Sequence, residues 1–247
     1  MEAGAGHRTR RHDAPAGLER ERIAGGMVVF HTLGMLSGVP VVTADGEKRP
    51  IQGFLFDDRS WLVRYLVVEA GNWLAPQTVV LSTAAVNVPD WKAKRVRTQL
   101  TLQQVLGSPP AETVRPVSRQ QELAWSRHFG WPDEEARWHF PAIAAQWEFE
   151  GGAADDPHLR RAGDLKGYEV WGPQGALGQL QGYLVGDRSW HIAYLAVRAR
   201  QWAHGEQVIS TRRVCGISWG EHRVWLEGAL NAPRNCEEAR PGGLPPV

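Results

Sequence analysis

The side chains that could do chemistry are few and scattered along the chain. Cys215 and His222 are the nearest candidates for a nucleophile and its base, because a thiol activated by histidine attacks carbonyl groups. Asn87 stands at the position equivalent to Cys215 in an internal repeat, and no motif surrounds the pair. We therefore expect Cys215 to be a packed, unreactive thiol.

Other reactive constellations are missing from the sequence. The nine histidines are dispersed, and no pair has the spacing of a metal site on a helix or a hairpin. Gly172, Gly175 and Gly178 are spaced by threes and do not form a phosphate-binding G-x-G-x-x-G loop. Ser60 and Ser189 lack the flanking glycines of a nucleophile elbow. The sequence predicts no catalytic residue, no metal site and no cofactor, and thus a protein that is not an enzyme.

Two groups of charged residues could bind ions or phosphates. Asp57 and Asp58 are adjacent, and adjacent side chains on extended backbone diverge, so we expect solvated turn residues. The basic run from Lys92 to Arg97 could contact phosphate, although Trp91 is the one aromatic residue beside it. Charges that protect the edge of a sheet explain this run equally well.

Composition and charge limit the function classes. A chain of 247 residues with 43% hydrophobic and 22% charged residues can bury a globular core. Its 28 basic and 27 acidic side chains give a formal net charge of +1, so no global field draws the protein to nucleic acid or to an anionic membrane.

The cysteines and the apolar stretch near the N-terminus indicate the cellular compartment that we expect for the protein. Cys215 and Cys236 are too few for a disulfide framework and lack metal-ligand spacing, which favours a reducing cytoplasm. The apolar stretch 26–42 is interrupted by His31 and Pro40, and no small-residue cleavage site follows it. We expect a cytoplasmic protein that is not inserted in a membrane.

An internal repeat is the strongest pattern in the sequence. A shift of 129 residues aligns 36–73 with 165–202 without a gap, and 16 of the 38 aligned pairs are identical. Chance would give roughly two or three. The longest identical run is DRSW, at 58–61 and again at 187–190. After one deletion the shift becomes 128, and each unit spans about 65 residues. We interpret the repeat as a duplication.

Each unit reads as β-structure. The expected strands of the first unit are rich in branched and aromatic residues and comprise 39–43, 51–56, 62–69, 78–82 and 95–100. Turn residues separate them, including Asp45-Gly46, the favoured pair for a two-residue hairpin turn. Short strands at this spacing predict a small, strongly bent sheet or barrel.

The repeated DRSW run lies where one strand must reverse into the next. Its Asp and Ser can bond their own backbone in the turn, and its Trp can fold back onto the barrel. Trp73 and Trp202 also allow this interpretation, as apolar plugs at the end of a barrel. The repeat of the motif thus follows from the repeat of the hairpin.

At these residues the chain resembles a known family. The run FLFDDRSWLVRYLVVEAGNWL with VVLSTAAV, and its weaker echo GYLVGDRSWHIAYLAV with QVISTRRV, resemble the PRC-barrel family. That family is named after the soluble domain of the reaction-centre H subunit and includes the C-terminal domain of a ribosome-maturation factor. The segment LTLQQVLGSPPAETVRPVSRQQELAWSRHFGWP is similar to the connector of stand-alone tandem members from bacteria. The resemblance implies small all-β barrels used as docking modules, with no shared catalytic residue.

The expected fold class is all-β, with two small PRC-type barrels in tandem, related by duplication and joined by a short helical connector. The resemblance covers about residues 36–230, and the final run NAPRNCEEARPGGLPPV departs from the family pattern. A capping box at Thr101 and Gln104 and a second one at Ser118 and Gln121 each predict a short connector helix. The expected segments are a disordered extension (1–35, with Met35 as an alternative start), a first barrel (36–100), a helical and irregular acidic connector (101–164), a second barrel (165–230) and a tail (231–247).

Three classes of function remain open. The first is a non-catalytic docking module with a protein partner of unknown identity, and a homodimer is left open. The second is an RNA- or ribosome-associated assembly factor that uses the basic run, and the third is an enzyme with an unrecognised site between the barrels. For the first class, the seam between units is the expected binding surface, because large flat side chains supply binding energy at low entropic cost. The candidate rim residues, which the competing interpretation treats as barrel plugs, are Arg59, Trp61, Trp73, Arg188, Trp190 and Trp202.

Overall fold

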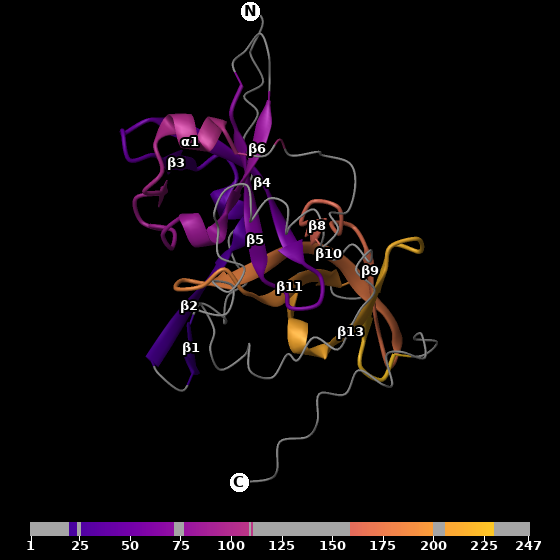
Figure 1. The fold of residues 1–247 in the computed structure, drawn as a ribbon. Coiled ribbons are helices and arrows are strands. Elements are labelled where there is room, and N and C mark those ends of the chain that lie inside the picture. Colours follow the sequence, from indigo (N-terminus) through magenta and orange to yellow (C-terminus); the bar gives the residue numbers. More distant parts are fainter. Residues whose placement is uncertain are drawn as a thin grey trace, which may run out of the picture.

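The computed structural model describes residues 20–23, 26–71, 77–108, 110, 159–199 and 206–229. These residues form two sheets. In Figure 1 most strands of the first sheet are violet to magenta, most strands of the second are orange to yellow, and the exceptions are described below. The mostly β character expected from the sequence is confirmed.

The first sheet has six strands in the order β6-β5-β4-β3-β7, and β8 pairs with β4 beside this path. The strands are β3 (Pro40–Val42), β4 (Lys48–Asp57), β5 (Val63–Glu69), β6 (Thr78–Ser82), β7 (Val96–Arg97) and β8 (Leu159–Arg161). A short 3-10 helix, η2 (Thr83–Ala85), follows β6, and the helix α1 (Leu102–Leu106) follows β7.

The second sheet has eight strands in the order β1-β2-β10-β9-β14-β13, and β11 and β12 continue from β10. The strands are β1 (Arg20–Ile23), β2 (Gly26–Thr32), β9 (Glu169–Gly172), β10 (Gly175–Gly186), β11 (Ile192–Ala199), β12 (Glu206–Ser210), β13 (Val214–Ser218) and β14 (Arg223–Leu226). The 3-10 helix η1 (Leu33–Leu36) follows β2, and η3 (Thr211–Arg213) follows β12.

The strand pairings of the two sheets match each other. In the first sheet β3 runs parallel to β7 and antiparallel to β4, and in the second β9 runs parallel to β14 and antiparallel to β10. Val41 lies opposite Val96, and Val170 lies opposite Val224, which are the positions related by the sequence shifts of 129 and 128. The internal repeat of the sequence thus has a counterpart in the backbone pairing.

The predicted closure into barrels is not seen. Among the strands that the structure describes, β6 is not paired with β7, and β12 is not paired with β13. In each sheet a 3-10 helix occupies this gap, held by Thr83 Oγ1 donating to Val63 O at 3.0 Å and by Thr211 Oγ1 donating to Ile192 O at 3.0 Å. Both sheets are therefore bent and open at the same place.

The strand that precedes each unit pairs with the other sheet. β2 leads through η1 into β3 of the first sheet, yet it pairs antiparallel with β10, where His31 lies opposite Val185. β8 leads into β9 of the second sheet, yet it pairs antiparallel with β4, where Arg160 lies opposite Phe56. Figure 1 shows the orange β8 among the violet strands and the indigo β2 beside the orange ones. We call β2 and β8 the exchanged strands.

This exchange corrects two expectations from the sequence. Disorder was expected for residues 1–35, but residues 20–23 and 26–36 form β1, β2 and η1. The segment 101–164 was expected to be helical and irregular, but it contains β8. Both strands form because a sheet edge accepts their backbone hydrogen bonds, and such a partner cannot be inferred from local sequence.

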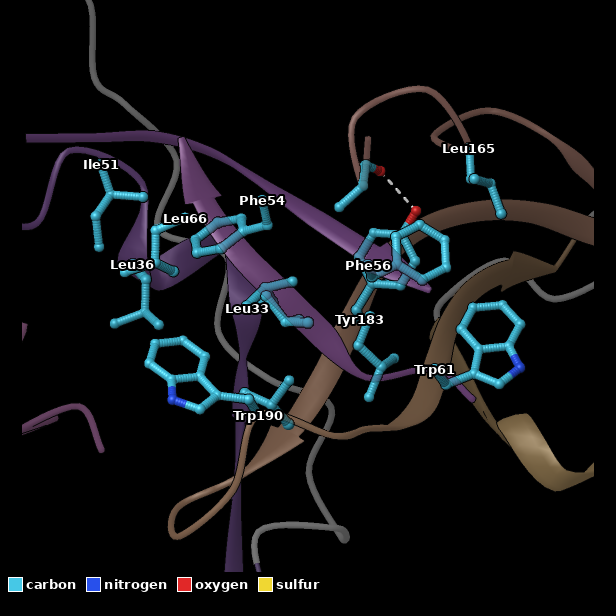
Figure 2. Close-up of a cluster of buried hydrophobic side chains, with 14 of the residues drawn as sticks. Leu33, Leu36, Ile51, Phe54, Phe56, Trp61, Leu66, Leu165, Tyr183 and Trp190 are labelled. Carbon is cyan, nitrogen blue, oxygen red and sulfur yellow. Dashed lines mark hydrogen bonds between the residues drawn. The ribbon is translucent and has the colours of Figure 1, made fainter. Parts of the chain in front are cut away.

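A shared hydrophobic core joins the sheets. It contains Phe54, Phe56 and Leu66 from the first sheet and Tyr183 and Val185 from the second, all of them buried. Figure 2 shows that Tyr183 lies directly against Phe56, and the ring centroids are 6.1 Å apart. The two sheets therefore bury their apolar faces against each other.

Two local expectations are confirmed. Gly46 has φ +85° in the turn that joins β3 to β4, a conformation that glycine adopts without strain. The capping box of α1 is present, because the Thr101 side chain accepts from Gln104 N and the Gln104 side chain accepts from Thr101 N. The second predicted capping box, at Ser118, lies outside the described residues.

The exchange of β2 predicts the effect of starting the chain at Met35. Such a chain lacks β2, together with the buried Phe30 and Leu33. Burying each of these side chains stabilises by about 1.5–3 kcal/mol, so we expect the free energy of unfolding to fall by about 3–6 kcal/mol. Urea denaturation measures the loss. A chain that starts at Gly26 retains β2 and serves as the control, and equal stability of the two truncated chains would contradict the exchange.

Candidate functional site

The repeated DRSW turns meet each other between the sheets. Val63 N donates to Trp190 O at 2.9 Å, and Ile192 N donates to Trp61 O at 2.8 Å. Leu62 and His191 form the antiparallel bridge between these two bonds. We call this contact between residues 57–63 and 186–192 the central contact. It is reciprocal, since equivalent backbone groups of each turn bond the other.

The tryptophans of the two turns are buried in the core. Trp61 is 5% exposed and Trp190 is 1% exposed. Figure 2 places Trp190 beside Leu33 and Leu36, and places Trp61 beyond Phe56 on the side of Leu165. Neither indole can form the rim of a binding surface in this structure, so the rim prediction is wrong for this pair and the competing core interpretation holds.

The other candidate rim residues have different positions. Arg188 is exposed at the tip of its turn, and Arg59 is partly buried in the equivalent turn. Trp73 and Trp202 lie outside the described residues. Among the rim residues that the structure describes, Arg188 is thus the exposed one.

The first turn is built around a buried carboxylate. Asp57 is 4% exposed, and its Oδ1 accepts from Arg59 N at 3.0 Å and from Ser60 N at 2.8 Å. These bonds hold Trp61 at φ +57°, a left-handed conformation that is unfavourable for a bulky residue. Gly186 replaces Asp57 in the second turn. The two turns therefore reach the same contact by different local bonds.

Each exchanged strand carries a side chain that stacks on a tryptophan from the same half of the chain. The Arg160 guanidinium lies 4.3 Å from the ring centroid of Trp219, and the His31 ring stacks on Trp91 at 4.1 Å with an interplanar angle of 12°. These pairs occupy equivalent positions, since His31 and Arg160 are related by a shift of 129 and the tryptophans by 128.

An ion pair adds to one of these stacks. Arg160 Nε lies 2.9 Å from Asp58 Oδ2, and both side chains are 13% exposed. Desolvated guanidinium groups favour partners that combine a carboxylate with an aromatic face. The expectation that Asp57 and Asp58 are solvated turn residues is thus wrong, because one caps a buried turn and the other pairs with Arg160.

His191 is the titratable group at the central contact. Burial and, to a smaller extent, the nearby charge of Arg212 lower the pKa of His191 to about 4, although a bond to the Ser60 backbone acts in the opposite direction. The imidazole is therefore neutral at neutral pH. Leu62 is the equivalent residue of the first turn, so the site tolerates an apolar side chain in this position.

The structure gives no sign of chemistry at the other candidates from the sequence, which are Cys215 and the basic run from Lys92 to Arg97. Cys215 is disulfide-bonded, so the expectation of a packed thiol is wrong. Disulfides are typical of oxidising compartments, and this bond counts against the reducing compartment that the cysteine count favours. In the basic run, Arg95 pairs with Asp90 at 3.5 Å. No group of three metal-binding side chains occurs among the described residues.

The sequence contained little information about the exchanged strands. The ungapped repeat starts at Leu36, and of the six preceding aligned pairs, 30–35 with 159–164, only Gly34 and Gly163 match. Extending the shift of 129 across this region would have paired His31 with Arg160, without showing which sheet either one contacts.

Comparison of the chain with protein-family models gave no match, and comparison with curated proteins gave none either. None of the helices in the described part of the chain could span a lipid bilayer.

The burial of Trp190 predicts a large effect of truncation. We expect Trp190→Ala to lower the free energy of unfolding by about 3–5 kcal/mol, because a core cavity replaces the indole. Chemical denaturation followed by circular dichroism measures the change. Arg188→Ala, two residues away and exposed, is the control, and equal effects of the two substitutions would show that the indole is not core.

His191 predicts a pH dependence of stability. The folded pKa of about 4 lies below the ordinary value of 6.5, so the unfolded state binds the proton more tightly. The free energy of unfolding therefore falls as pH decreases from 6.5 to 4, by about 3 kcal/mol from this residue alone.

His191→Leu isolates this contribution, since it introduces the residue found at the equivalent position. Urea titrations at pH 7 and pH 4 should show a loss for the original chain that exceeds the loss for the variant by about 3 kcal/mol. Identical losses in the two proteins would mean that His191 titrates normally.

Proposed function

We propose that the chain is a non-catalytic protein-binding module made of two duplicated units of the PRC-barrel kind. The matching strand pairings of the two sheets support the duplication. The resemblance of both DRSW regions to that family supports the kind of unit. Bent sheets with a 3-10 helix at the same point fit units that diverged from one ancestor.

The observation that carries the binding function is the uptake of an added strand by each sheet. β4 accepts β8, and β10 accepts β2, although neither added strand is contiguous with its sheet. Addition of an extended segment to a sheet edge is a general mode of peptide recognition, in which main-chain bonds supply affinity and side-chain pockets supply specificity. A unit that binds segments of its own chain this way is suited to bind a segment of another protein.

The proposed partner-facing surface is the predicted rim without its two buried indoles. Of its described members, Arg188 is exposed and Arg59, in the equivalent turn, is partly buried. Trp73 and Trp202 are included in the proposed surface because the sequence predicts them as rim residues. Arginine and tryptophan are the side chains most enriched at protein-binding hot spots.

Charge reversal at Arg188 tests this proposal. The full chain carrying a photo-reactive cross-linker at Gln179, an exposed residue of β10, is expressed in its source cell, and cross-linked proteins are identified by mass spectrometry. We expect Arg188→Glu to reduce recovery of the specific partner at least tenfold with an unchanged melting temperature. Arg213→Glu, an exposed arginine of η3, is the matched control and should retain the partner. Equal recovery with both variants would refute the proposed surface.

A further inference from the structure

The two halves of the chain are each incomplete without the other. The first half, residues 26–108, contributes β4, whose Leu55, Phe56 and Asp57 pair with β8 of the second half. The second half, residues 159–229, contributes β10, whose last three residues pair with β2. Removing either half would leave backbone groups of the other half unpaired beside apolar side chains, an arrangement that is costly in water and prone to association.

Polar contacts between the halves are also specific. Ala162 N of the second half donates to Phe54 O of the first half at 3.0 Å. Within the second half, Ala162 O accepts a bond of 2.6 Å from the buried Tyr183 hydroxyl. This bond, drawn in Figure 2, holds the end of β8 between the two sheets. Burial raises the pKa of Tyr183, so the phenol keeps the proton that it donates.

Charge complementarity adds to these bonds. Asp58 belongs to the first half, and Arg160, its partner at 2.9 Å, belongs to the second. The guanidinium also lies over the ring of Trp219, which belongs to the second half as well. The described contacts between halves thus combine main-chain pairing, a shared apolar core and a desolvated ion pair, which is the composition of a permanent protein–protein interface.

We propose that this interface is a self-sufficient binding surface whose partner is the complementary half of a second copy of this chain. The covalent connection sets the local concentration of the halves, and the interface itself supplies their recognition. When two copies of the chain are cut between the halves, the first half of one copy therefore binds the second half of the other, and the two rebuild the same pair of sheets. This inference does not depend on the proposed function.

Cleavage of the folded full-length protein tests the inference. A specific protease sequence is inserted between Gly151 and Gly152, and the folded protein is cut. We expect both fragments to co-elute in gel filtration at low micromolar concentration with a melting temperature close to that of the uncut protein. Separation or precipitation of the fragments on cleavage would overturn the proposal.

Exchange with a second copy is the next measurement on the same material. Cut protein with a fluorescent label on the first half is mixed with an excess of unlabelled cut protein, unfolded in urea and diluted. The second half of the unlabelled protein carries an affinity tag. We expect purification on this tag to recover fluorescent first halves. Absence of this mixed complex, when the labelled protein alone reassembles, would also overturn the proposal.

Arg160 supplies a variant with a matched control. Arg160→Leu removes the ion pair to Asp58 and the stack on Trp219, so we expect the dissociation constant of the halves to rise at least tenfold. Arg161→Leu changes the neighbouring side chain of β8, which faces the opposite side of the strand. It should leave the dissociation constant within about twofold, and equal effects of the two variants would show that recognition does not use this contact.

Discussion

Reciprocal exchange of two strands is the constraint on which the rest of the structure depends. β4 and β10 are the longest strands of their sheets, and each has an edge that neither its own hairpin nor β3 or β9 covers at the end nearest the DRSW turn. Buried backbone groups must be hydrogen-bonded, so these edges need a further strand. β8 and β2 supply it from across the molecule. Because each added strand enters from the other unit, the sheets are held against each other, and their apolar faces form one core.

The chemistry around this exchange explains why the DRSW run occurs twice. The backbone of the two runs takes part in the reciprocal bonds of the central contact, and both tryptophans are buried in the shared core. Asp58, in the first run, forms an ion pair with Arg160 of the exchanged strand β8. In the second turn, Gly186 and His191 replace Asp57 and Leu62, so the same contact is made with different side chains. A neutral, partly buried His191 costs stability in acid, and a left-handed Trp61 costs stability at any pH. Both unfavourable features lie in the central contact, which joins the two sheets.

Sequence reasoning predicted the elements better than their partners. The β-rich segments, the Asp45-Gly46 turn and the Thr101 capping box depend on neighbours in the chain, and the structure confirms them. The exchanged strands could not be predicted, because the partner of an edge strand depends on tertiary contacts and Gly34 with Gly163 is the one match in that region. At the candidate site, the repeat of Trp61 as Trp190 is consistent with two core residues or with the rim of a binding surface. Only the burial of the side chains in the structure distinguishes these interpretations. The bond of Cys215 was also missed, since spacing in sequence does not show which cysteines meet.

Cross-strand proton contacts measured by NMR test the exchange most directly. Isotope-labelled full-length protein should show nuclear Overhauser contacts between the backbones of His31 and Val185 and between those of Arg160 and Phe56, which lie opposite each other. The equivalent arrangement without exchange would instead place His31 opposite Phe56 and Arg160 opposite Val185. Contacts of the first kind support the exchange of strands, and contacts of the second kind would contradict it, because each unit would then complete its own sheet.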